Sequence, residues 1–131
     1  MHHRLLGRTG LSVPVLSFGA SSLGGVFRQT DDSEAIRAVH VALDLGMDFI
    51  DVSPYYGATK AETVLGKALK GIDRGRYVLA TKIGQYGTGE FDFSAARVVR
   101  ALDESGARLG VDTIDLLQGH DVEFADLNQS V

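Results

Sequence analysis

Strand-like apolar runs alternate with helix-like segments along most of the sequence, and no other feature constrains the fold as strongly. The strand-like runs cover residues 15–20, 49–52, 77–83 and 113–117. Between them, apolar residues recur at helical spacing from Asp31 to Gly46, from Thr59 to Gly71 and from Ser94 to Gly110. Strands that are separated in sequence by helices predict a parallel sheet with right-handed crossovers.

Residue types at the ends of these segments support the helix boundaries. Asp31 or Asp32 can cap the first helix, Thr59 with Glu62 forms the spacing of a capping box, and Ser94 can cap the third helix. Before the first run, residues 4–13 flank a turn-rich stretch and predict a short hairpin. After the fourth run, residues 124–131 predict a loop or the start of a fourth helix.

Strand and helix alternation fits both an open doubly wound sheet and a (β/α)8 barrel. A dinucleotide-binding open sheet would place a G-x-G-x-x-G turn directly after the first strand. Residues 19–25 read GASSLGG instead, and they do not lead directly into a helix. Polar residues that are spread over several strand ends favour the barrel, so we predict a (β/α)8 barrel, represented by its hairpin, about four strands and three helices.

Four polar residues follow or end the strand-like runs. Asp51 and Tyr56 lie in FIDVSPYYG, Lys82 ends YVLATK, and His120 ends TIDLLQGH. In a barrel the carboxyl ends of the strands converge on one face, where catalytic residues gather. An Asp, a Tyr, a Lys and a His at that face are suited to proton transfer to or from a carbonyl or alcohol oxygen.

Composition narrows the possible classes of function. The chain has 131 residues, a net charge of -4 and a pI of about 5.4; this composition gives no basic footprint and argues against nucleic-acid binding. It contains no cysteine, which excludes disulfides and thiolate metal sites and fits a cytoplasmic protein. No apolar run is long enough to span a membrane. His and carboxylate residues do not gather at metal-ligand spacing, so a metal-dependent hydrolase is not favoured.

Several ordered segments resemble the aldo-keto reductases. They are LGRTGLSV, LSFGASSLGG, GMDFIDVSPYYG, AETVLGKALKG, VLATKIG and TIDLLQGHD, and with FDFSAARV and HDVEF they are most similar to the L-galactose dehydrogenase-like branch. The resemblance covers essentially the whole chain. It implies a (β/α)8 barrel of which residues 1–131 form the N-terminal half of one domain, and hydride transfer between NAD or NADP and an alcohol or carbonyl.

The resemblance also implies roles for individual residues. Tyr56 corresponds to the general acid/base, Lys82 to the lysine that favours its phenolate, and Asp51 to the carboxylate paired with that lysine. A free phenol ionises only near about pH 10, so a neighbouring ammonium is needed for proton exchange at neutral pH. His120 corresponds to the residue that orients the substrate oxygen. Gly19 and Ala20, together with Asp51, correspond to positions near the nicotinamide end of the cofactor.

Two departures from the family pattern are visible. Gly119 precedes His120 where a bulkier residue is usual, and residues 1–131 do not supply the family's phosphate-binding loops. Two functions therefore stay open. The first is an NAD- or NADP-dependent oxidoreductase acting on a sugar or small aldehyde. The second is a truncated half-barrel that is inactive alone and acts, if at all, through self-association or a partner chain.

Overall fold

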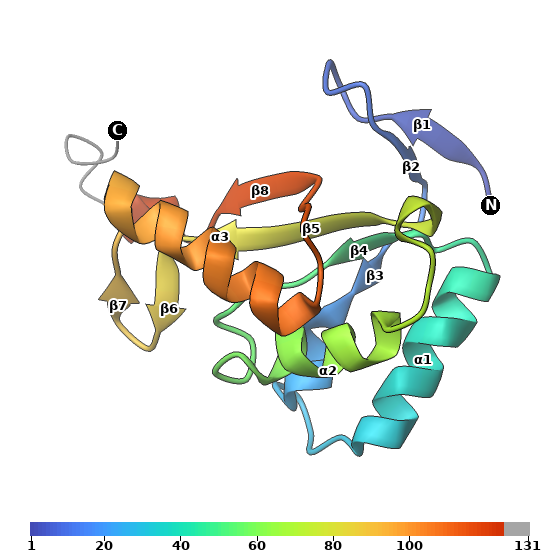
Figure 1. Cartoon of the computed structure of the whole chain (residues 1–131), viewed down its shortest axis with the longest axis horizontal. Coiled ribbons are helices and arrows are strands. Elements are labelled where there is room, and N and C mark those ends of the chain that lie inside the picture. Colours follow the sequence, from blue (N-terminus) through green and yellow to red (C-terminus); the bar gives the residue numbers. More distant parts are fainter. Residues whose placement is uncertain (125–131) are drawn as a thin grey trace.

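A parallel four-stranded sheet forms the centre of the computed structural model, which describes residues 1–124. Its strand order is β3-β4-β5-β8, with β3 at Phe18–Gly19, β4 at Phe49–Asp51, β5 at Val78–Ile83 and β8 at Leu116–Gly119. Consecutive neighbours in this order are also consecutive along the chain, apart from the hairpins (Figure 1). This is the order expected of successive strands in a β/α barrel.

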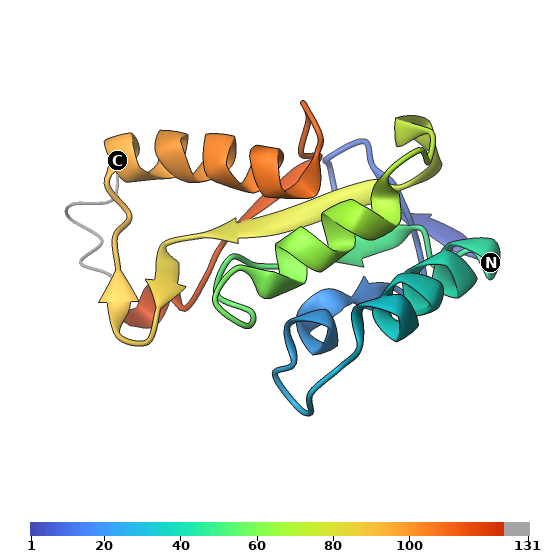
Figure 2. The same cartoon turned by 60° about the horizontal axis from the view of Figure 1, so that its bottom comes forward.

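Three helices cover one face of the sheet (Figures 1 and 2). They are α1 at Asp32–Asp44, α2 at Lys60–Leu69 and α3 at Ala95–Leu109, and α2 packs against both of the others. The core lies between the helices and the sheet, and its largest fully buried apolar side chains are Ile50, Leu65, Leu79, Leu109, Val39, Val52 and Val64. None of the helices in the described part of the chain is long and apolar enough to cross a membrane.

Two antiparallel hairpins lie at opposite ends of the parallel strands (Figure 1). The predicted hairpin is confirmed as β1 at His3–Leu5 paired with β2 at Ser12–Pro14, beside the amino ends of the strands. A second hairpin, β6 at Gln85–Gly87 and β7 at Glu90–Phe91, follows β5 at the carboxyl ends. The sequence analysis did not predict it.

All three helix starts were predicted correctly, and the expected side-chain cap is present at two of them. The Asp31 carboxylate accepts hydrogen bonds from the amides of Ser33 and Glu34, and the Ser94 hydroxyl accepts one from the amide of Arg97. The prediction of a capping box at Thr59 was wrong, although α2 does begin directly after this residue. Thr59 has a left-handed backbone and no side-chain cap, and Glu62 points into the protein, where other partners hold it.

The first and fourth strands differ from their predicted extents. The run at 15–20 was expected to be a strand buried on both faces, but only Phe18–Gly19 is paired, and Val15 and Leu16 are 56% and 55% exposed. The reason is that the chain bends after β2 before it joins the sheet. The fourth strand begins at Leu116 rather than 113. Residues Val122–Phe124 form a short 3-10 helix, η3, and the loop or helix expected over 125–131 lies outside the described residues.

Candidate active site

The centre of the candidate site is an ion pair between neighbouring strands. Asp51 ends β4 and Lys82 lies near the end of β5. The ammonium Nζ of Lys82 donates to both carboxylate oxygens of Asp51, at 2.7 and 2.6 Å, and to the Val52 carbonyl at 3.2 Å. The Lys82 side chain is only 11% exposed and that of Asp51 28%. Bidentate pairing in a partly buried position holds the lysine side chain in place.

The alternation of side chains along β5 turns Lys82 away from the helices. Leu79 belongs to the helix-facing core, and the Thr81 hydroxyl donates to Glu62 of α2 at 2.7 Å. Because successive strand residues point to opposite faces, Lys82 lies on the other face. Asp51 is likewise opposite the core residues Ile50 and Val52. This face corresponds to the interior of a β/α barrel.

Tyr56 lies next to the ion pair, in the loop between β4 and α2. The Lys82 Nζ is 5.1 Å from the centre of the Tyr56 ring. The loop packs backbone against backbone on η1, the 3-10 helix at Ala20–Gly24. A Cβ atom at Gly57 would collide with the backbone of Gly24, and Gly57 has a φ of 63°. Only glycine suits this close approach, and the contact fixes the position of Tyr56.

His120 completes the group at the end of β8. Its amide donates to the Ile83 carbonyl at 2.9 Å, which continues the pairing with β5. The rings of Tyr55 and Tyr56 both meet the imidazole edge-on, with centres 5.7 Å away and interplanar angles of 79° and 81°. The structure thus brings together Asp51, Tyr56, Lys82 and His120, as the sequence analysis predicted; their catalytic roles stay predictions.

One neighbour of His120 was not predicted. The hydroxyl of Ser53 lies 3.1 Å from His120 Nδ1, and Ser53 is fully buried. The signal in the sequence was a hydroxyl residue directly after the second strand. It was overlooked because a lone serine in a loop carries no motif, and only the fold brings it to a histidine 67 residues away.

Burial lowers the pKa of His120 below its ordinary value. The Lys82 ammonium also lowers it, whereas the carboxylates of Asp121, Asp51 and Glu123 oppose the shift without reversing it. The imidazole is therefore neutral at neutral pH and can form directional hydrogen bonds through both ring nitrogens, one as donor and one as acceptor.

We expect the His120 imidazole in the complete protein to titrate below the ordinary histidine value of about 6.5. As the pH falls through that value, the unfolded chain binds the proton before the folded chain does, so this group reduces the free energy of unfolding on acidification. Imidazole chemical shifts followed by NMR against pH, with His120→Asn to assign the signal, measure the midpoint. A midpoint at or above the ordinary value would contradict the expectation.

Gly19 and Ala20 lie beside the ion pair. Gly19 pairs with Asp51 in the β3–β4 register and is exposed, and no atom lies within 4 Å of the position that a Cβ would occupy. This leaves room for a flat ring to approach the backbone at Gly19, as the predicted contact with the nicotinamide end of a cofactor requires; the cofactor-binding roles of Gly19 and Asp51 stay predictions. Ala20 is fully buried, so of the two residues Gly19 offers the accessible surface.

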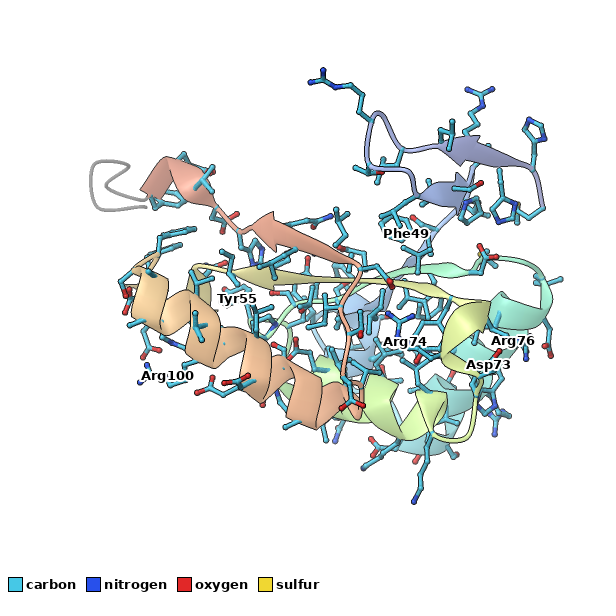
Figure 3. All side chains as sticks on the ribbon, turned by 45° about the horizontal axis from the view of Figure 1, so that its top comes forward. Phe49, Tyr55, Asp73, Arg74, Arg76 and Arg100 are labelled. Atoms are coloured by element: carbon cyan, nitrogen blue, oxygen red, sulfur yellow. The ribbon has the colours of Figure 1, made fainter. Side chains whose placement is uncertain are left out.

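A cavity of about 370 Å³ opens next to the tyrosines. Its lining comes from η1, from the loop before α2 and from the β6–β7 hairpin, and comprises Gly24, Gly25, Val26, Tyr55, Gly57, Ala58, Tyr86, Gly87 and Thr88. Figure 3 shows Tyr55 toward the carboxyl ends of the strands and Arg74 toward the opposite end. Two larger cavities, about 680 and 600 Å³, open beside α3 and are lined by none of the four site residues.

Gly119, where the family pattern has a bulkier residue, lies against η3. A Cβ atom at this position would come within 2.7 Å of a methyl carbon of Val122. The glycine therefore accommodates the close approach of η3 to the end of β8, directly before His120.

The strand order, the helices on one face and the polar residues at the carboxyl ends are those expected of half of a β/α barrel. Comparison with known proteins agrees. Residues 15–127 match the model of the aldo/keto reductase family, and the chain belongs to this family. The fold class expected from the sequence is confirmed.

The chain is similar to several named proteins of this family. It is 49% identical over 130 residues to L-galactose dehydrogenase from Arabidopsis thaliana, covering 98% of this chain and 40% of that protein. It is 33% identical to D-threo-aldose 1-dehydrogenase from a Pseudomonas species, covering 91% and 43%. Among solved structures, the holo form of an aldo-keto reductase from Bacillus halodurans matches with a TM-score of 0.83 and 33% identity, covering 100% of this chain and 44% of that one. The chain thus spans less than half the length of these relatives.

Proposed function

We propose that the complete protein containing this chain is an NAD- or NADP-dependent oxidoreductase that interconverts a sugar hydroxyl and the matching carbonyl, with Tyr56 as general acid/base. The observation that carries the proposal is the bidentate Lys82–Asp51 pair beside the Tyr56 ring, whose other ring contact is the edge-on imidazole of His120. These residues lie at or after the carboxyl ends of three adjacent strands, where barrel enzymes carry out their chemistry.

Each residue has a distinct part in the proposed reaction. When bound, the nicotinamide ring accepts or delivers the hydride. Tyr56 takes the proton of the substrate hydroxyl during oxidation and returns it to the carbonyl oxygen during reduction. The positive charge of Lys82 stabilises the phenolate that forms, and Asp51 keeps that charge in place. His120, being neutral, hydrogen-bonds the substrate oxygen and orients it for transfer.

The substrate class is proposed from the relatives and the cavity. Two of the relatives above are named for the oxidation of L-galactose and of D-threo-aldoses, and the 370 Å³ cavity beside Tyr55 offers backbone polar groups and two aromatic rings. We therefore propose an aldose such as L-galactose as the substrate. We further propose that the isolated chain of residues 1–131 is inactive.

The proposal is tested by following nicotinamide reduction by the complete protein with a panel of aldoses, first with NAD and then with NADP. We expect turnover with at least one aldose and none with residues 1–131 alone. Asp51→Asn should lower kcat about tenfold, because a neutral amide holds the ammonium less strongly than a carboxylate does. Ser12→Ala, on the far hairpin, serves as the matched control. Absence of turnover with all aldoses and both cofactors would refute the proposed function.

A further inference from the structure

Ser53 is buried beside the Nδ1 atom of the His120 imidazole. It has no exposed surface. Its hydroxyl oxygen accepts a hydrogen bond from the amide of Tyr55 at 3.1 Å and lies 3.1 Å from His120 Nδ1. The rings of Tyr55 and Tyr56 both contact the imidazole edge-on. The imidazole is therefore fixed both in position and in the direction of its Nδ1 edge.

The direction of the hydrogen bond between Ser53 and His120 follows from the donors and acceptors that surround the Ser53 hydroxyl. A hydroxyl has one hydrogen to donate and two lone pairs, and the Tyr55 amide already uses one lone pair. Within residues 1–124, His120 Nδ1 is the acceptor in reach of the Ser53 hydrogen. If Nδ1 carried a proton and donated it to Ser53, the buried hydroxyl would be left with no acceptor, which is unfavourable. The buried serine therefore donates, and Nδ1 accepts.

We propose that Ser53 is a positioning residue that holds neutral His120 in the tautomer with its proton on Nε2. The two ring nitrogens cannot both be acceptors in the neutral ring, so an accepting Nδ1 requires a donating Nε2. Within the described residues Nε2 has no hydrogen-bond partner in the protein, so this N–H is available to a ligand oxygen.

The consequence concerns the reaction and rests on the proposed function. A donating Nε2–H polarises a carbonyl oxygen and stabilises negative charge that develops on it. The opposite tautomer would present a lone pair to that oxygen and repel it. The lowered pKa of His120 agrees with a neutral ring, because burial disfavours the imidazolium.

The test is the tautomeric state of His120 in the complete protein with ¹⁵N-labelled histidine. Long-range ¹H–¹⁵N NMR spectra distinguish the two neutral tautomers by the shifts of the two ring nitrogens. In the unmodified protein we expect a single neutral form, protonated on Nε2. Observation of the Nδ1-protonated form as the major species would overturn the proposal, whether or not any variant folds.

Three variants extend the test. Ser53→Ala should give a mixture of tautomers and raise the pKa of His120, and kcat should fall about two- to tenfold as the competent fraction falls. Cofactor affinity should be unchanged. Ser53→Thr keeps the hydroxyl and should retain the tautomer and the activity, while Ser12→Ala should change neither. An unchanged His120 spectrum in folded Ser53→Ala would overturn the proposal.

The spectra also separate this proposal from the proposed function. If no aldose is turned over but His120 shows the Nε2 tautomer and responds to Ser53→Ala, the positioning role holds and the proposed reaction fails. If turnover is found but His120 shows the other tautomer, the proposed reaction holds and the role of Ser53 fails.

Discussion

Tyr56→Phe should reduce the turnover of the complete protein by about 10²- to 10⁴-fold, the range expected for loss of a general acid/base. Phenylalanine keeps the ring that meets His120 edge-on and lies 5.1 Å from the Lys82 ammonium, but it removes the hydroxyl that exchanges a proton with the substrate oxygen. The affinity for NAD or NADP should be nearly unchanged. Steady-state kinetics, together with a fluorescence titration of the cofactor, measure both quantities.

Tyr55→Phe is the matched comparison, because Tyr55 meets the same imidazole at the same distance. Tyr55 also lines the neighbouring cavity, so a modest rise in KM is expected, with kcat staying within about tenfold of the original. If Tyr55→Phe lost turnover and Tyr56→Phe kept it, the assignment of the acid/base to Tyr56 would be wrong.

Glu62→Ala should lower the free energy of unfolding by about 3–5 kcal/mol, the cost of removing one partner from a buried ion pair. The Glu62 carboxylate is fully buried and accepts from Arg108 Nε of α3 at 2.6 Å and from the Thr81 hydroxyl of β5 at 2.7 Å. It therefore connects α2, α3 and the strand that carries Lys82. Alanine leaves the mostly buried Arg108 without its counter-charge. Such a loss is a large share of the roughly 5–15 kcal/mol of a typical domain.

Urea-induced unfolding of the complete protein measures this change. Glu34→Ala is the control, because Glu34 pairs with Arg28 at the surface, with side chains that are 47% and 71% exposed. We expect the control to change stability by less than about 1 kcal/mol. A similar small change for Glu62→Ala would show that the buried pair does not stabilise the fold.

The sequence was sufficient to predict most of the candidate site because its members are marked by local context. Asp51 and Lys82 are polar residues at the ends of apolar strands, and His120 repeats that pattern at the fourth. Ser53 and Glu62 could not be predicted in the same way. Ser53 becomes relevant only because β8 brings His120 to it, and Glu62 lies at a spacing that indicated a cap rather than a buried ion pair.

By itself the sequence determined the order of the parallel strands and the three helices, and the end of the sheet at which the polar residues gather. These follow from periodicity and chain direction, which are local properties. Only the tertiary structure decided that Val15 and Leu16 stay outside the sheet, that Gly24 and Gly57 touch, and that a buried hydroxyl meets His120 Nδ1. These features depend on residues that are distant in sequence. The direction of the hydrogen bond between Ser53 and His120 also depends on burial, because a buried hydroxyl must find its partners within the protein.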